Sequence, residues 1–198
     1  MISYIQRQLK ASADAALQAA EHQAAPIQDA ARMIITCIEN GGKVLVCGNG
    51  GSAADSQHIA AELVGRFLIN RQALPAVALT TDTSVLTAVA NDFGYETVFS
   101  RQVEALGKPG DVLLGISTSG TSDNVVRAAR LARTKGMKVI ALAGSKFTDF
   151  CADADVAITV SNPDTPRIQE VHITVGHIIC DLVEKHISGV NKTEQTGV

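Results

Sequence analysis

The chain has 198 residues and a formal net charge of −3, with 17 Lys and Arg against 20 Asp and Glu. This length fits one domain with a continuous core, and the scattered basic residues argue against direct binding of nucleic acid. Because the first residues lack the pattern of a secretory signal and no run of about 18 apolar residues predicts a membrane span, we expect a cytoplasmic protein.

The apolar residues indicate what kind of core the chain builds. Trp is absent and aromatic residues make up only 4% of the chain, so the core must consist of Ala, Val, Ile and Leu. The cysteines lie within apolar patterns and show no C-x-x-C spacing, which predicts reduced, packed thiols rather than disulfides or a zinc site. They are Cys37, Cys47, Cys151 and Cys180.

Residues 1–40 are predicted to form two helices that belong to the same domain. Residues 2–24 carry an apolar stripe at helical spacing. Pro26 fits the first turn of a second helix, which Asn40-Gly41-Gly42 ends. Both helices precede the first strand, so we expect them to pack against another subunit. At the other end, residues 188–198 are predicted to be a flexible tail.

The stretch from Lys43 to Phe67 carries the pattern on which the interpretation of the other segments depends. An apolar strand at 44–47 runs into a glycine turn at 48–52, and a segment with helical periodicity follows. Glycines allow positive φ and close approach of a ligand, and Ser52 is expected to cap the helix, whose N-terminus suits an anionic or polyhydroxylated ligand. Behind the turn, His58 and Glu62 lie four residues apart and therefore share one helix face.

Strands and helices alternate through the rest of the chain. Apolar runs predict further strands at 75–79, 111–116, 138–142 and 155–160. Helices are predicted from 80–82 to a break at Asn91-Asp92-Phe93-Gly94, and then at 96–106, 123–135 and 166–186. The pattern predicts an α/β fold, a five-stranded parallel sheet flanked by helices on both faces. Since ligands bind at the carboxyl ends of such strands, residues 48–52, 80–82 and 117–122 should share one edge.

Residues 117–122, Ser-Thr-Ser-Gly-Thr-Ser, follow the third strand and open a helix. Short hydroxyls and backbone N–H groups at a helix N-terminus can ring a phosphate, so we predict phosphate binding there. A dinucleotide site is the alternative, because Gly48-x-Gly50 and Asp82 loosely fit that fingerprint. It is disfavoured because Asp82 lies beyond the usual spacing of about 20 residues and because His58 and Glu62 would have no role.

The last predicted helix carries His172 and His177. Taken alone, histidines on a helix with such an apolar stripe fit packed or capped side chains better than catalytic ones. Arg167 and Glu170 lie three residues apart and are expected to form an ion pair.

Four ordered stretches give the chain a specific resemblance: GNGGSAADSQHIAAELVGRF, AVANDFGYETVFSRQVEALG, GDVLLGISTSGTSDNVV and RIQEVHITVGHI. Over residues 43–185 they resemble the phosphoheptose isomerases of the sugar isomerase (SIS) fold family. The resemblance implies one SIS domain over 41–187 and an aldose–ketose isomerase acting on sedoheptulose 7-phosphate and D-glycero-D-manno-heptose 7-phosphate. That reaction opens the synthesis of ADP- or GDP-heptose precursors for lipopolysaccharide or related glycans. A homotetramer with one zinc ion per subunit is also implied.

The resemblance implies a role for each matching residue. Glu62 is the implied base and His177 the implied acid. The implied zinc ligands are His58, Glu62, Gln169 and His177. The implied substrate contacts are Asn49, Gly50, Gly51, Glu62, Asn91, Asp92, Ser117, Thr118, Ser119, Ser122 and Gln169.

These residue types suit the implied chemistry. Aldose–ketose exchange needs a base, an acid and a cation that holds developing negative charge, and a mixed set of imidazole and oxygen ligands suits Zn²⁺. However, Gln169 and His177 lie eight residues apart, about 12 Å along a straight helix. We therefore predict either that a neighbouring subunit supplies one of these two groups or that Gln169 lies in a bent first turn.

Other functions stay open on the sequence alone. A non-enzymatic SIS protein that binds a replication initiator would lack the intact His/Glu pattern, so Glu62 argues against it. A sugar-phosphate-sensing regulator would need a DNA-binding module, which we do not recognise in the sequence. An isomerase of a shorter ketose phosphate remains an alternative, because contacts to a phosphate and a diol do not depend on the number of carbon atoms in the sugar.

Overall fold

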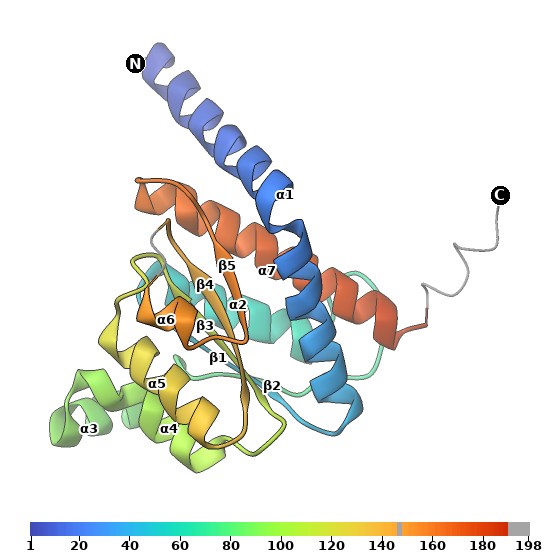
Figure 1. Cartoon of the computed structure of the whole chain (residues 1–198), viewed down its shortest axis with the longest axis vertical. Coiled ribbons are helices and arrows are strands. Elements are labelled where there is room, and N and C mark those ends of the chain that lie inside the picture. The colour runs from blue at the N-terminus through green and yellow to red at the C-terminus, as the bar shows by residue number, and fades with distance from the viewer. Residues whose placement is uncertain (146–147, 190–198) are drawn as a thin grey trace.

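The computed structural model describes residues 1–145 and 148–189 (Figure 1). Five parallel strands form one sheet in the order β2-β1-β3-β4-β5. They are β1 (Val44–Gly48), β2 (Ala76–Ala78), β3 (Val112–Ser117), β4 (Lys138–Ala143) and β5 (Val156–Thr159). The five predicted strands and their parallel pairing are thus confirmed. The predicted tail lies outside the described residues from residue 190 onward.

Helices cover both faces of the sheet, as predicted. They are α1 (Ile2–Glu39), α2 (Gly51–Val64), α3 (Thr83–Phe93), α4 (Val98–Leu106), α5 (Asp123–Thr134), α6 (Asp149–Ala152) and α7 (Thr165–Ile187), with a 3-10 turn η1 (Tyr95–Thr97) before α4. Strand residues alternate between the faces. In β1, Val44 and Val46 pack toward α1, α2 and α7, whereas Leu45 and Cys47 pack toward α4, α5 and α6. All four cysteines are buried free thiols.

The prediction of two N-terminal helices is wrong, because α1 continues through Pro26 without a break. A proline inside a helix removes one N–H bond and kinks the helix. Packing on both sides of the proline offsets that cost. Gln23 hydrogen-bonds the backbone and side chain of Thr159 in β5, and Ile27 and Ala30 are buried. Figure 1 shows α1 bending between its outer part and the part that lies on the domain.

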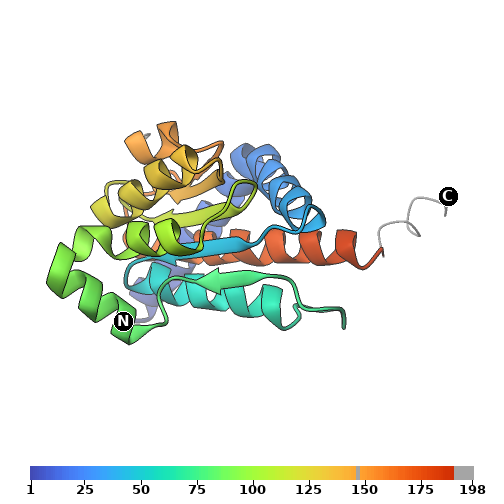
Figure 2. The ribbon, with the colours of Figure 1, turned by 90° about the horizontal axis from the view of Figure 1, so that it is seen from below.

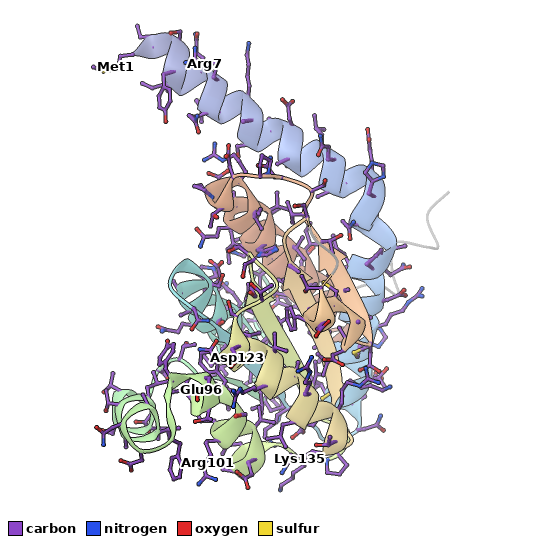
Figure 3. The ribbon with its side chains drawn as sticks, turned by 60° about the vertical axis from the view of Figure 1, so that its left-hand side comes forward. Met1, Arg7, Glu96, Arg101, Asp123 and Lys135 are labelled. Atoms are coloured by element: carbon purple, nitrogen blue, oxygen red, sulfur yellow. The ribbon has the colours of Figure 1, made fainter. Side chains whose placement is uncertain are left out.

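The outer part of α1 extends away from the rest of the domain. Figure 3 shows Met1 and Arg7 at this end, remote from the sheet. The apolar stripe predicted for this helix is largely exposed here, with Ile2 at 74% and Leu9 at 67% exposed. None of the helices in the described parts of the chain is both long enough and apolar enough to cross a membrane.

Helix α3 ends within the predicted break at Asn91-Asp92-Phe93-Gly94. It continues to Phe93 and stops at Gly94, whose φ of 88° is positive. The prediction that Ser52 caps α2 is wrong, because the helix begins at Gly51 and Gly50, with a φ of 57°, holds the N-cap position. The short helix α6 was not predicted at all.

Helices α2 and α7 lie side by side and run in the same direction (Figure 2). A Cβ atom at Gly51 would lie 2.6 Å from Nε2 of Gln169, and one at Gly176 would lie 2.7 Å from Cδ1 of Ile59. Glycine at these two positions therefore lets the helices approach closely. The residues of α2 that face α7 meet the residues about 117 positions later, and this register decides which polar groups meet.

Candidate active site

The site begins at the carboxyl ends of β1 and β3. After β1 the chain crosses to β2, which pairs with one edge of β1, whereas the next strand, β3, pairs with the other edge. The order of the strands therefore reverses direction between β1 and β3. Parallel α/β sheets bind ligands at such a point. The turn at 48–52 and the loop at 117–122 therefore lie at one edge, as predicted, with residues 80–82 after the neighbouring strand β2.

The turn after β1 is fixed by a pair of amides. Asn49 and Asn124 each donate a side-chain hydrogen bond of 2.9 Å to the other, and the Tyr95 hydroxyl donates a third, of 3.1 Å, to Oδ1 of Asn49. This occupies the side-chain oxygen of Asn49, leaving one amide hydrogen and its backbone for a ligand. The sequence reasoning missed Asn124 and Tyr95, because no local pattern links these distant segments.

The hydroxyl loop after β3 folds onto itself. Oγ of Ser117 lies 2.9 Å from Oγ of Ser122 and accepts the backbone N–H of Gly120, and Oγ of Ser119 accepts the N–H of Thr121. The hydroxyls thus gather at the N-terminus of α5, where the helix dipole favours an anion. A cleft of about 480 Å³ borders the loop, and its lining includes Thr118, Ser119, Thr121, Thr165 and Ile168.

Two histidines and a glutamate converge behind the glycine turn. Nε2 of His58 lies 3.1 Å from Oε1 of Glu62 on the same helix and 2.9 Å from Nε2 of His177 on α7. The two imidazole rings meet edge to face, with their centroids 5.0 Å apart. The side chain of His58 is 49% exposed and that of Glu62 is 22% exposed, so a ligand can reach the cluster from solvent.

The atoms of this cluster fit a divalent cation. Two Nε2 atoms at 2.9 Å either share a proton or direct both lone pairs toward a positive ion. One ligand atom from each of His58, Glu62 and His177 lies within 4.8 Å of the other two. Tetrahedral Zn²⁺ with bonds of about 2.0 Å needs ligand atoms about 3.3 Å apart, so small side-chain shifts would complete three corners of that geometry.

Asp55 is a neighbour of the cluster that the sequence reasoning missed. It lies one turn before His58 on α2, and its Oδ2 is buried without a hydrogen-bond partner among the described residues. Burial raises the pKa of this carboxyl, while the nearby imidazoles of His58 and His177 lower it. Its i, i+3 spacing from His58 was the one local signal that could have revealed it.

Other predicted residues lie apart from the cluster. Gln169 lies in regular helix against Gly51, which precedes His58 by seven residues or about 10 Å of helix. Asn91 and Asp92 are exposed at the end of α3 and hydrogen-bond each other. Within one chain the structure therefore brings together three of the four predicted metal ligands, without the bent first turn considered for Gln169.

Three other polar residues of α7, namely Arg167, Glu170 and His172, have structural partners. Arg167 pairs with Glu170, as predicted, and also donates to the backbone oxygen of Gln8 in α1. His172 is fully buried, with Nε2 3.0 Å from the backbone oxygen of Ala143. Burial lowers its pKa to about 4. His172 is thus a packed, neutral histidine, whereas His177 joins the cluster.

Comparisons with known proteins agree with this fold. The SIS domain matches residues 8–144. A phosphoheptose isomerase of Akkermansia muciniphila is 51% identical over 189 residues, which cover 96% of this chain and 100% of that protein. Solved structures of phosphoheptose isomerases from Neisseria gonorrhoeae and Francisella tularensis superpose with TM-scores of 0.88 and 0.90. They are 46% and 38% identical, cover 92% and 93% of this chain, and are each 98% covered.

The fold and the site together define a protein with a single SIS domain, the class to which sugar isomerases belong. Identity near 50% over almost the whole length narrows this class further. The chain belongs to the phosphoheptose isomerase family.

Proposed function

We propose that the chain interconverts sedoheptulose 7-phosphate and D-glycero-D-manno-heptose 7-phosphate, the first step toward heptose precursors of lipopolysaccharide or related glycans. Membership of the family makes the chain an aldose–ketose isomerase. The observation that carries the proposal is the meeting of His58, Glu62 and His177 at one point on α2 and α7, behind the glycine turn that opens α2. A base, an acid and a cation site are the groups that this reaction needs.

In the proposed reaction Glu62 moves a proton between C1 and C2 through an enediol. His177 exchanges a proton with the carbonyl oxygen. The predicted zinc ligands are His58, Glu62, His177 and Gln169, and the bound ion would supply positive charge for the negative charge that develops on the substrate oxygens. Because neither Glu62 nor Nε2 of His177 can be a tight ligand and exchange a proton at the same time, we expect the bonds of both groups to the metal to be weak.

The substrate would lie between the two turns. Hydroxyls and N–H groups of Ser117, Thr118, Ser119 and Ser122 would hold the phosphate. The sugar would contact Asn49, Gly50, Gly51, Asn91, Asp92 and Gln169. The neighbouring cleft supports this placement because it borders the hydroxyl loop and the start of α7.

We further propose a homotetramer in which a neighbouring subunit supplies Gln169 to the cation. Two observations support self-association: the distance between Gln169 and the cluster of its own chain, and the exposed apolar residues on the outer part of α1. Sedimentation at falling protein concentration, with activity measured in parallel, tests this. An active, dissociated monomer with a complete site would contradict it. Free buried thiols support a cytoplasmic location, where cysteines stay reduced.

The direct experiment is to incubate purified protein with sedoheptulose 7-phosphate and follow aldose formation, with and without a chelator. Ketose phosphates of five and six carbons are run in parallel. We expect turnover of the seven-carbon substrate, loss of turnover with chelator, and recovery with Zn²⁺. Faster turnover of a shorter ketose would replace the proposed substrate, and no turnover of any would favour a binding protein with this fold.

A further inference from the structure

The His177 imidazole is stacked against Phe67, a residue to which neither the sequence patterns nor the proposed reaction assigns a role. The two ring centroids lie 5.6 Å apart and the ring planes differ by 22°. The torsion that turns an imidazole about its Cβ–Cγ bond is broad and roughly two-fold. A half-turn about it would put Cε1 in the place of Nε2 and turn the reactive nitrogen away from His58. A ring packed against the imidazole face restrains that rotation.

Phe67 lies in a segment without helix or strand, yet the segment is held firmly. The carboxylate of Glu184 accepts three successive backbone N–H bonds, from Phe67 at 2.8 Å, Leu68 at 2.6 Å and Ile69 at 2.7 Å. Glu184 is on α7, seven residues after His177, and two turns of helix bring both to the same face. The helix that carries the acid therefore also carries the group that anchors the ring beside it.

Arg71 completes the arrangement and extends it to the base. Its Nε lies 3.1 Å from Oε1 of Glu184, and the two side chains are 5% and 0% exposed. Its Nη atoms donate to the backbone oxygens of Glu62 and Leu63 at 2.9 Å, which are among the last carbonyls of α2. One buried ion pair thus joins the end of the helix carrying Glu62 to the helix carrying His177.

The charge state of this pair is fixed by its partners. Burial alone would raise the pKa of the Glu184 carboxyl, but the three N–H donors and the Arg71 guanidinium lower it below its usual value. A buried, fully bonded carboxylate takes no part in proton transfer. Its contribution is to hold the backbone around Phe67 in one position.

We propose that Phe67, fixed by the buried Arg71–Glu184 pair, is a positioning residue that keeps Nε2 of His177 directed at the cluster. This inference rests on the proposed role of His177 as the acid. It concerns the turnover step rather than binding, because the loop assigned to the substrate phosphate follows β3 and makes no hydrogen bond or ring contact with Phe67 among the described residues.

The test compares three single variants. Phe67→Leu removes the ring, Phe67→Tyr keeps it, and Leu68→Ala is the matched control, because Leu68 is adjacent, 65% exposed and retains its backbone bond to Glu184. For sedoheptulose 7-phosphate we expect kcat of Phe67→Leu to fall about tenfold with KM within about twofold. Phe67→Tyr and Leu68→Ala should stay within about twofold of wild type. Equal kcat in Phe67→Leu and Leu68→Ala, or a loss as large in Phe67→Tyr, would overturn the proposal.

A second measurement does not depend on the substrate. Nitrogen-15 NMR of the imidazole, assigned by the signal lost in His177→Gln, reports the tautomer and the ring environment of His177. We expect one defined set of His177 signals in wild type and Phe67→Tyr, and averaged or shifted signals in Phe67→Leu. Unchanged signals in Phe67→Leu would overturn the positioning role. If wild type turns over no ketose phosphate while the signals change as expected, the proposed function fails and the positioning role stands.

Discussion

Two polar clusters connect α2 and its following segment to α7, and they differ in how completely their atoms are bonded. The cluster of His58, Glu62 and His177 is open to solvent, and its imidazole nitrogens face each other at 2.9 Å. The pair of Arg71 and Glu184, two turns further along α7, is closed: both side chains are buried and the carboxylate accepts three N–H bonds. The closed cluster fixes the geometry, and this allows the open cluster to keep ligand atoms unsaturated.

The largest effect should come from the open cluster. Glu62→Gln removes the proposed base, so we expect kcat to fall about 10³-fold. The Glu62 side chain is 22% exposed, and its pair with His58 joins two residues of the same helix. The free energy of unfolding should therefore change by less than about 1 kcal/mol. Aldose formation and urea unfolding measure the two effects. Glu21→Gln, on an exposed side chain of α1, is the matched control, and full turnover in Glu62→Gln would exclude Glu62 as the base.

The closed cluster should show the opposite behaviour, a loss of stability. Glu184→Gln leaves the buried Arg71 guanidinium without its counter-charge, and we expect the free energy of unfolding at pH 7 to fall by about 3 kcal/mol. Glu104→Gln is the control, because its exposed pair with Arg101 contributes less than about 0.5 kcal/mol. Urea unfolding measures both, and equal losses would mean that the buried pair is no more important than a surface pair.

The pH dependence of that loss follows from the lowered pKa of Glu184. A carboxyl whose folded pKa lies below its ordinary value of 4.5 stabilises the fold above that pH. The contribution is lost as the pH falls through the folded pKa. The difference between wild type and Glu184→Gln should therefore be constant from pH 7 down to about 5 and shrink below about pH 4.5.

A cation should stabilise the open cluster and leave the closed one unaffected. Zn²⁺ at about 100 times its dissociation constant is expected to add about 2.7 kcal/mol to the free energy of unfolding. His58→Leu should abolish this gain, whereas His186→Leu, which alters an exposed histidine paired with Glu39, should retain it. Thermal unfolding with and without Zn²⁺ measures the effect. An equal gain in His58→Leu would place the cation elsewhere.

Local patterns predicted the sheet well. In a chain whose apolar runs alternate with predicted helices, short runs of β-branched and aliphatic residues between turns are best buried as strands of a parallel sheet. They failed at Pro26. The local cost of a proline in a helix is about 3 kcal/mol, and tertiary contacts, among them those of Gln23 and Ile27, outweigh it. Helix continuity at this point is decided by packing that no local window contains.

The same distinction applies to the site. The pairing of His58 with Glu62 was predictable from helical spacing, and the clustering of 117–122 from its position after a strand. The contact between His177 and His58 depends on the parallel packing of α2 and α7, which hydrophobic periodicity does not predict. Only the family resemblance implied that these two histidines meet. Phe67 was missed because its contact with His177 depends on a tertiary interaction. The hydrogen bond from its backbone to Glu184 holds it against α7.

His172 on α7 extends the comparison to a buried group without a charged partner. It is buried like Glu184 but stays uncharged. Its pKa of about 4 in the folded chain lies below the value of about 6.5 expected in the unfolded chain. Between these values the unfolded chain binds a proton that the folded chain does not. Stability therefore falls as the pH falls through this window, by about 2 kcal/mol between pH 7 and pH 5 from this residue alone.

His172→Gln should remove that part of the pH dependence while keeping a donor for the backbone oxygen of Ala143. We expect the free energy of unfolding of His172→Gln to change less between pH 7 and pH 5 than that of wild type, and His22→Gln, on an exposed side chain, to follow wild type. Urea unfolding at both pH values measures the slopes. Equal slopes in wild type and His172→Gln would mean that His172 can accept a proton inside the fold. Burial without a counter-charge would then not keep an α7 histidine neutral.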